Sequence, residues 1–233
     1  MRVLVETMGV SDPMLQSARD ALCADTLADG TTVVLAEDWA ALETLNREHA
    51  ESWFPLLPRP AGAPTFWLAA VDHEGEPVAV QAAALLDCST ASLGERLEDL
   101  TAFHDPGGAP SDDWCFVASA TARETHGPVA LITSGWTRPD WRGRGLFHRL
   151  GRLVRLVVLE RWAVRWVAGL VDPETVPQWS AAKAGHRHLD PHPTILLHQT
   201  GAGRLPLHLL RFTTASVRLD LSAHARRSLV TAG

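Results

Sequence analysis

The amino-acid sequence predicts a folded protein of the α/β class. Its 233 residues are 46% hydrophobic, which is enough for one large domain, or for one domain with extensions. Two apolar, strand-like stretches, 65–71 and 77–86, flank a turn-like tetrapeptide and predict a β-hairpin. From residue 128 onward the pattern changes to a strand, a glycine-arginine turn, a long amphipathic helix and another strand, which together predict a β-α-β unit.

Two helices and a strand are predicted before the hairpin. Asp12 is a suitable N-cap and Pro13 suits the first helical position, so a helix is expected to run to about Leu27. The segment 31–36 is predicted to be a strand, and Asp38 can cap a second helix. The apolar positions of that second helix recur at helical spacing, at Trp39, Leu42 and Leu45.

The hairpin is followed by an acidic connection, 87–113, in which we expect a short helix near 93–100 and a loop. The β-α-β unit then consists of a strand at 129–137, a helix from about 145 to 162 and a strand at 165–171.

Two more elements are predicted after this unit. A helix from about 174 to 184 is expected to end at Gly185, which suits the first position beyond a helix. The segment 194–199 is predicted to be a strand.

Charge is divided unevenly along the chain. Residues 1–127 hold 21 acidic side chains and 6 arginines, a net charge of −15, whereas residues 128–233 hold 6 acids and 15 bases, a net charge of +9. Such a division indicates two differently charged faces, one suited to a cation and one to a polyanion, or else only an unevenly charged solvated surface.

Several classes of function are disfavoured by composition. The three cysteines are widely spaced, which indicates neither a disulfide framework nor a zinc site and favours a cytoplasmic setting. No metal is expected, because the histidines near 186–198 lack a companion ligand at a familiar spacing. No apolar run is long enough for a membrane helix, and the net charge of −6 argues against nucleic-acid binding. There are nine tryptophans but no tyrosine, so a phenol cannot act as a proton donor.

The most informative segment, Pro139–Leu146, lies where a predicted strand meets the long helix. Glycines in such a turn let backbone N–H groups approach an anion, the helix N-terminus adds partial positive charge, and arginines add formal charge. The segment therefore predicts a phosphate cradle, although arginine-glycine turns are also common as plain structural turns. It is neither a P-loop nor a dinucleotide-binding fingerprint.

The region 128–199 resembles the GNAT superfamily of acyl-CoA N-acyltransferases. The hallmark of that family is a V-x-P strand end followed by [QR]-x-x-G-x-[GA] at a helix start. Here Thr137–Pro139 matches the strand end, while Arg142 and Gly145 take the first and fourth motif positions. The later segment 181–186 is similar to the family's Y-e-k-l-G-F.

This resemblance implies a GNAT-like mixed, mostly antiparallel central sheet flanked by helices. The GNAT-like domain would span 31–199, between an N-terminal helical extension, 1–30, and a C-terminal extension, 200–233. The C-terminal extension would either belong to the same domain or form a contact in a homodimer.

The resemblance also implies an acyl-CoA co-substrate, most simply acetyl-CoA. Backbone amides of the turn and first helical turn would hold the CoA diphosphate, and the end of the strand would pair with the pantetheine arm. Arg144 and Arg149 would reach the adenosine-side phosphate, and the Trp136 side chain would form a wall for the acyl chain or the acceptor. The cofactor-binding candidates are Trp136, Thr137, Arg142, Gly143, Arg144, Gly145, Leu146 and Phe147.

The sequence departs from the family pattern at two positions. The sixth motif position, normally glycine or alanine, is Phe147, and the tyrosine that protonates the leaving thiolate in many relatives is replaced by Ala181. The catalytic candidates that remain are Thr133 and Ser134, which could position a water, Glu124 just before the strand, and Ser180 beside Ala181. Further acid–base candidates in loops are Asp87, His104 and His126.

Two functions follow as hypotheses. The first is an N-acetyltransferase in which a small, cationic primary amine, held by the acidic half, attacks the thioester directly in a ternary complex. The second is a non-catalytic module of the same fold that binds a CoA ester or a partner, which the missing tyrosine and Phe147 favour.

Overall fold

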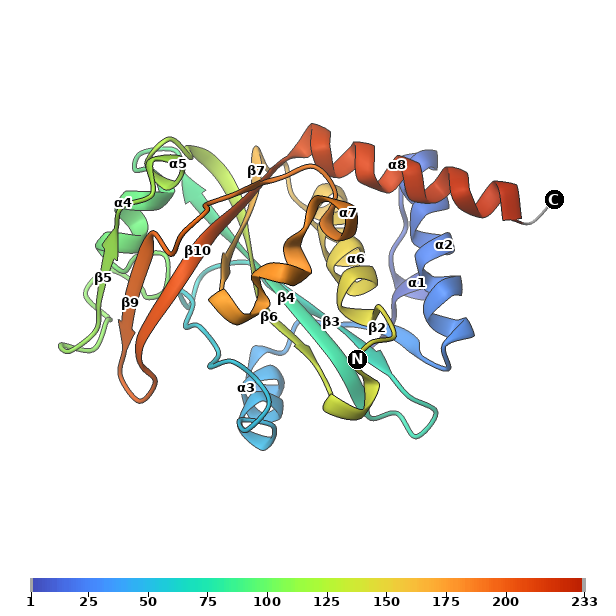
Figure 1. Ribbon diagram of the computed structural model, residues 1–233, viewed down its shortest axis with the longest axis horizontal. Coiled ribbons are helices and arrows are strands. Elements are labelled where there is room, and N and C mark those ends of the chain that lie inside the picture. The colour runs from blue at the N-terminus through green and yellow to red at the C-terminus, as the bar shows by residue number, and fades with distance from the viewer. Residues whose placement is uncertain (1, 232–233) are drawn as a thin grey trace.

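The computed structural model describes residues 2–231, which fold around a ten-stranded sheet (Figure 1). Its strands are β1 (Arg2–Val3), β2 (Thr32–Ala36), β3 (Thr65–Val71), β4 (Pro77–Cys88), β5 (Trp114–Val117), β6 (Gly127–Thr137), β7 (Trp166–Val171), β8 (His188–Leu189), β9 (Ile195–Gln199) and β10 (Gly203–Thr213). The strand order is β1-β2-β3-β4-β6-β7-β10-β9-β5, with β8 paired to β10. Within the described residues β6 and β7 are the one parallel pair, which confirms the predicted mixed, mostly antiparallel sheet.

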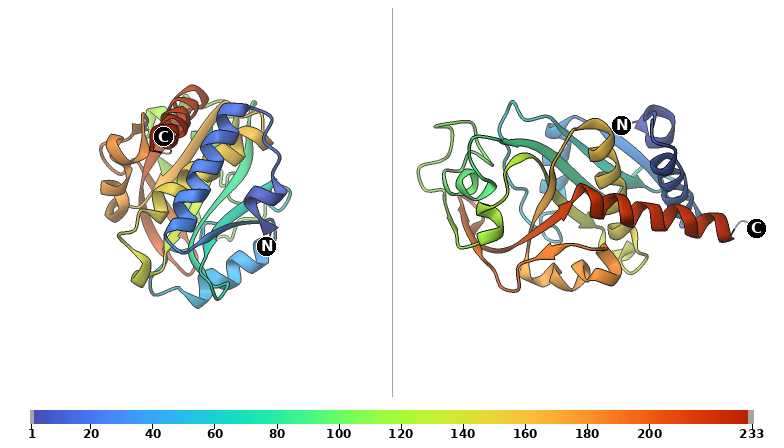
Figure 2. Two further views of the ribbon diagram at one scale, coloured as in Figure 1. Left: turned by 90° about the vertical axis from the view of Figure 1, so that its right-hand side faces the viewer. Right: turned by 90° about the horizontal axis from the view of Figure 1, so that it is seen from above.

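Helices cover both faces of this sheet (Figure 2). They are α1 (Leu4–Thr7), α2 (Pro13–Ala28), α3 (Trp39–Glu48), α4 (Leu93–Glu98), α5 (Ala120–Arg123), α6 (Leu146–Arg161), α7 (Ala181–Ala184) and α8 (Thr214–Thr231), with 3₁₀ turns η1 (Pro139–Trp141) and η2 (Pro173–Trp179). Helices α2, α6 and α8 share one apolar core on one face, while α3 packs over β2, β3, β4 and β6 on the other.

Several local signals in the sequence are confirmed. The Asp12 side chain accepts hydrogen bonds from the N–H groups of Met14, at 2.9 Å, and Leu15, at 3.4 Å, so it caps α2 as expected. Asp38 caps α3 through the N–H of Ala41. The hairpin and the β6-α6-β7 unit also form where the sequence places them.

Two segments differ from their predicted structure. The helix expected over 174–184 is instead η2 followed by the four-residue α7, because Pro173 and Pro177 remove backbone donors and Ser180 interrupts the helix in an extended conformation. Gly185 does follow the last helical residue, with φ +81°. After the acidic connection, residues 114–117 form the strand β5 at the edge of the sheet, where no strand was expected from the sequence.

Both extensions pack into the sheet and its helical layer. Strand β10 lies between β7 and β9, and α8 runs alongside α2 (Figure 1). Phe212, Val217 and Leu221 from this tail are buried in the same core as α6. None of the helices in the described range is long and apolar enough to span a lipid bilayer.

Candidate functional site

Strand β6 separates from its parallel neighbour halfway along its length. Its pairing with β7 covers Val129–Ile132, yet β6 continues to Thr137 beside β4. The register with β4 shifts between Val80 and Ala82, so that Ser134 and Gly135 lie opposite the single residue Gln81. This is a β-bulge, and Ser134 adopts φ +60° within it. Within the described part of the chain, one backbone edge of β6 is therefore left without a neighbouring strand from Thr133 onward.

The end of β6 leads through η1 into the N-terminus of α6. Gly143 and Gly145 adopt φ values of +82° and +77°, a left-handed conformation that side chains disfavour. Gly145 is the N-cap of α6, and no side chain in residues 2–231 caps this helix. The N–H groups of Arg144, Gly145, Leu146 and Phe147 have no acceptor among the described residues. Because unpaired amides and the helix dipole both point outward here, the turn is suited to an anion.

The arginines of this turn have different partners. Arg142 donates from Nε to the carbonyl of Thr137 and from Nη2 to that of Ser52, at 3.1 Å each, and so ties the turn to the segment after α3. Arg144 is exposed and its guanidinium lies over the Trp141 ring, 4.2 Å from the centroid. Arg149 forms an ion pair with Asp29 and donates to the carbonyl of Arg144. Arg144 is therefore better placed than Arg149 to meet a phosphate.

The side chain of Phe147 closes the space beside the bulge. Its ring packs so tightly on Gly135 that a Cβ at that position would lie 2.8 Å from Cε2. The ring also meets Trp179 edge to face, with centroids 5.3 Å apart and planes at 74°. The small space between α6 and α7, next to these rings, has no room for a water molecule.

The predicted catalytic residues are not all brought together. Thr133 and Ser134 are half-buried at the bulge, with their hydroxyl oxygens 3.5 Å apart. Ser180 precedes α7 and directly follows Trp179, across from the N-terminus of α6. Glu124 is instead exposed at the end of α5, three residues before β6 begins at Gly127, and Gly127 lies about 23 Å along the strand from Ser134. The structure does not support a role for Glu124 at the bulge.

Trp136 does not face α6. Its side chain is 3% exposed and belongs to the core under α3. It stacks on Trp53 at 4.8 Å and on His49 at 4.6 Å, and its Nε1 donates to the Ser52 hydroxyl. Its backbone can still pair with a ligand along the free edge of β6, but its side chain belongs to the α3 side of the sheet.

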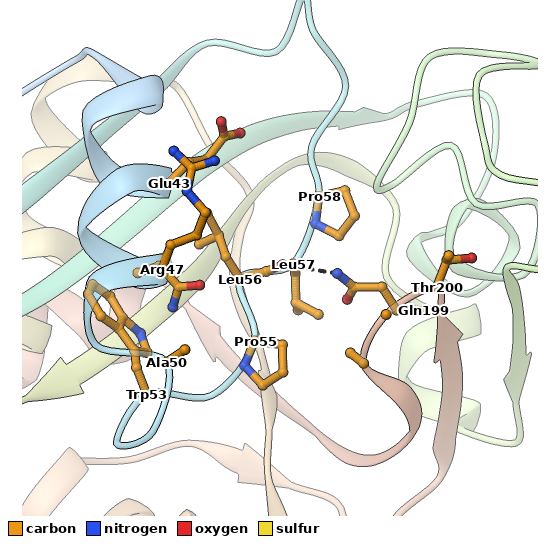
Figure 3. A pocket seen from close by; sticks show the side chains of 13 residues that line it. Glu43, Arg47, Ala50, Trp53, Pro55, Leu56, Leu57, Pro58, Gln199 and Thr200 are labelled. Carbon is orange, nitrogen blue, oxygen red and sulfur yellow. Dashed lines mark hydrogen bonds between the residues drawn. The ribbon is translucent and has the colours of Figure 1, made fainter.

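A groove of about 460 Å³ opens on that side, between α3 with its following loop and the β9–β10 turn (Figure 3). Its walls are mostly apolar, and Trp53 links it to Trp136. Its charged side chains are Glu43 and Arg47, one acid and one base on α3. The groove therefore has no excess of acid that would select a cation.

Two side chains outside the predicted site residues also matter here. Gln81 is 2% exposed, faces the bulge from β4, and its Oε1 has no donor among the described residues. Trp179 is 7% exposed and packs against Phe147. A single buried glutamine in an otherwise apolar strand is the one sequence signal that could have indicated the first of these.

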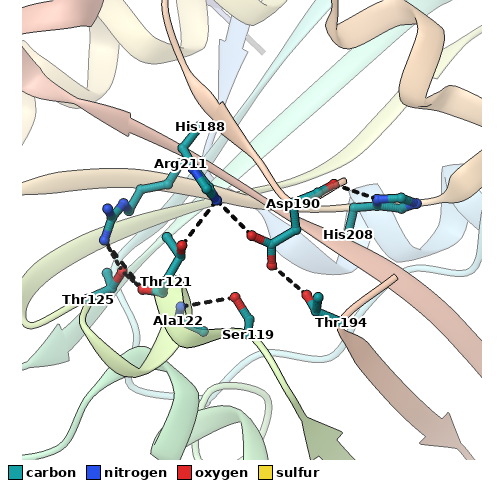
Figure 4. A network of polar contacts seen from close by, with 9 residues as sticks. All are labelled: Ser119, Thr121, Ala122, Thr125, His188, Asp190, Thr194, His208 and Arg211. Atoms are coloured by element: carbon teal, nitrogen blue, oxygen red, sulfur yellow. Dashed lines mark hydrogen bonds and ion pairs between the residues drawn. The ribbon is translucent and has the colours of Figure 1, made fainter. Parts of the chain in front are cut away.

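Of the histidines near 186–198, His188 belongs to a network of polar side chains that also includes His208 (Figure 4). His188 Nε2 lies 2.7 Å from Asp190 and 3.0 Å from the Thr121 hydroxyl. Burial raises the pKa of Asp190, but hydrogen bonds from Thr194, Ser119 and His188 outweigh it, so that this pKa lies below its usual value. The network joins α5 to β8, and the described residues contain no cluster of three or more metal-binding side chains.

No protein-family model matches this sequence, and no curated protein does either. Solved structures with a similar backbone fold include that of Arabidopsis thaliana NAA60 in complex with acetyl-CoA, which is 14% identical with a TM-score of 0.48. The match covers 79% of this chain and 99% of NAA60. The aminoglycoside acetyltransferase AAC(6')-Ib in complex with coenzyme A and kanamycin is 16% identical, with a TM-score of 0.45. That match covers 79% of this chain and 96% of the aminoglycoside acetyltransferase. Because all these values are low, the functional argument depends on the geometry of this chain.

Proposed function

We propose that this protein is an acyl-CoA-dependent N-acyltransferase that uses acetyl-CoA. The observation that carries the proposal is the junction of β6 and α6, where a bulged strand with a free edge leads directly into a glycine N-cap with unpaired amides. A free strand edge can pair with the amide groups of a pantetheine arm, and the N-terminus of α6 can hold a diphosphate. These two features lie in one continuous stretch of backbone, 133–147.

The residues present fit the diphosphate end of this co-substrate. The N–H groups of residues 144–147 would bind the phosphate oxygens, and Arg144 would add charge from the rim. The co-substrate supplies the activated thioester, and the backbone at the bulge would polarise its carbonyl group. The space beside Phe147, in contrast, is closed.

The acceptor amine would enter from the α3 side, through the groove next to Trp53 and Trp136. As the new C–N bond forms and the C–S bond breaks, the amine proton would pass to a water held by Thr133 or Ser134. His49, which stacks on Trp136, is an imidazole on the same side that could take up this proton. With Ala181 in place of a tyrosine, the thiolate would be protonated by water.

The proposal is tested by titrating the protein with acetyl-CoA in a calorimeter and then following thiol release with a panel of amines. Gly145→Glu places bulk and negative charge at the cradle and is expected to abolish binding. Gly107→Glu is the matched control, since Gly107 also has a positive φ and lies in the acidic loop with open space around it. No binding at millimolar acetyl-CoA would refute the proposal. Tight binding without thiol release would identify a non-catalytic module instead.

A further inference from the structure

The contact between Phe147 and Gly135 joins the first turn of α6 directly to the bulge of β6. Gly135 has no side chain, and the Phe147 ring takes the space in which one would lie. Trp179, from η2 on the other side of the opening, meets the same ring edge to face. The two aromatic side chains therefore bridge the gap that opens where β6 and β7 part.

A polar side chain lies beneath this aromatic pair. The side-chain amide of Gln81 lies between Gly135 and Gly151. A Cβ at Gly151 would be 3.0 Å from Oε1 of Gln81, and a Cβ at Gly135 would be 3.4 Å from its Nε2. Its Oε1 is buried without a donor in the described part of the chain. A buried acceptor without a donor costs free energy, and an amide N–H that entered the opening would satisfy it. The closed arrangement thus leaves the Gln81 Oε1 acceptor unsatisfied, and a ligand with amide N–H donors could hydrogen-bond to it.

The segment that carries Trp179 has little regular backbone structure, although Trp179 and Ala184 are buried in the core shared with α6. It consists of one 3₁₀ element with an internal Pro177 and of the four-residue α7. Two side chains of α6 hold it, Arg152 through a hydrogen bond to the Lys183 carbonyl and His148 through one with the Gln178 side chain. Elements with so few backbone hydrogen bonds open at low cost in free energy. Phe147, on the first turn of α6, can leave Gly135 by rotating about its side-chain bonds alone.

We propose that Phe147 and Trp179 form a gate over the gap between β6 and β7, and that the gate must part before a pantetheine arm can enter. This inference rests on the proposed function. A closed gate reduces the apparent affinity for CoA by the fraction of molecules that are open, and it makes opening a separate kinetic step. A diphosphate without the arm binds at the N-terminus of α6 and does not need the gate to open.

The test compares coenzyme A with ADP, which has the diphosphate but lacks the arm. Phe147→Ala is expected to bind coenzyme A about tenfold more tightly than the parent protein and to leave the Kd of ADP unchanged. In stopped-flow measurements of tryptophan fluorescence, the observed rate should reach a plateau with coenzyme A concentration in the parent protein and rise linearly in the variant. Phe116→Ala, which removes a phenyl ring that is 60% exposed on β5, is the control and should behave as the parent does.

Phe147→Leu provides a second variant, with an intermediate effect, if the alanine variant does not fold. Equal affinity for coenzyme A in the parent protein and both variants, with linear kinetics throughout, would overturn the gate and leave the proposed function standing. If neither ligand bound to any folded variant, the proposed function would fail together with the gate.

Discussion

Asp220 provides the sharpest prediction about stability, because one carboxylate of α8 pairs with two buried arginines of α6. Its Oδ2 lies 3.0 Å from Arg152 Nε and 3.3 Å from Arg155 Nη2. The side chain of Arg152 is 9% exposed, that of Arg155 is 3% exposed and that of Asp220 is 12% exposed. Burial lowers the pKa of Arg155 to about 10 even though Asp220 acts in the opposite direction. We predict that Asp220→Asn, which keeps the shape and removes the charge, destabilises the protein severely.

The size of the effect follows from the geometry. At an effective dielectric constant of about 20, each of these contacts gives an attraction of about 5 kcal/mol, against which desolvation and the repulsion between the two arginines act. Removing one partner from a buried ion pair typically costs about 3–5 kcal/mol, because the remaining charge stays buried and unpaired. For a domain of this length that corresponds to a fall in Tm of about 6–20 °C.

The measurement is thermal and urea unfolding, followed by circular dichroism. Arg218→Ala is the matched control, because Arg218 also joins α8 to another element, through an ion pair with Asp12 whose side chains are 47% and 30% exposed. Exposed pairs contribute little, so this variant should keep its Tm within about 3 °C of the parent. If Asp220→Asn lowered Tm no more than Arg218→Ala does, the argument from buried charge would be wrong.

Three further predictions follow from the same contacts. Gly185→Ala should lower the free energy of unfolding by about 2 kcal/mol or more in urea titrations, because Gly185 has φ +81° and a Cβ would lie 2.9 Å from Asp220 Cγ. Arg142→Ala, which loses its hydrogen bonds to the carbonyls of Thr137 and Ser52, should weaken acetyl-CoA binding several-fold in calorimetry with an unchanged Tm. Since hydrogen bonds hold the pKa of Asp190 below its ordinary value in the folded protein, its contribution to stability is complete above about pH 5 and is lost as pH falls through the folded pKa; Asp190→Asn should therefore flatten the acid limb of a Tm–pH curve.

The elements that were predicted correctly have their causes in neighbouring residues. Asp12 and Asp38 cap helices that begin one residue later, and the β3–β4 hairpin needs only a short turn. The glycines at 143 and 145 likewise have their positive φ values in a turn that the local sequence indicates. Strand β5 could not be predicted in this way, because it forms by pairing with β9, about eighty residues further along the chain.

The orientation of Trp136 shows why side-chain positions in the site could not be predicted. Along β6, Ala130 and Ile132 face the core shared with α6, while Val129 and Leu131 face the opposite side. Strict alternation would therefore place residue 136 on the α6 side. The extra residue of the bulge reverses this parity, so Trp136 pairs with Val80 and enters the core under α3. No feature of the local sequence reveals the bulge, because the register shift is relative to β4.

The uneven charge of the chain has a similar explanation in long-range contacts. The acidic and basic halves do not form two separate faces throughout, because their side chains meet where the first helices pack against α6 and α8. Arg149 pairs with Asp29, Arg161 with Glu37 and Arg218 with Asp12. Part of the net charge of −15 in residues 1–127 is thus neutralised within the fold, and the groove under α3 has one acid and one base. Selection of the acceptor would accordingly depend on the apolar walls around Trp53 more than on a negative field.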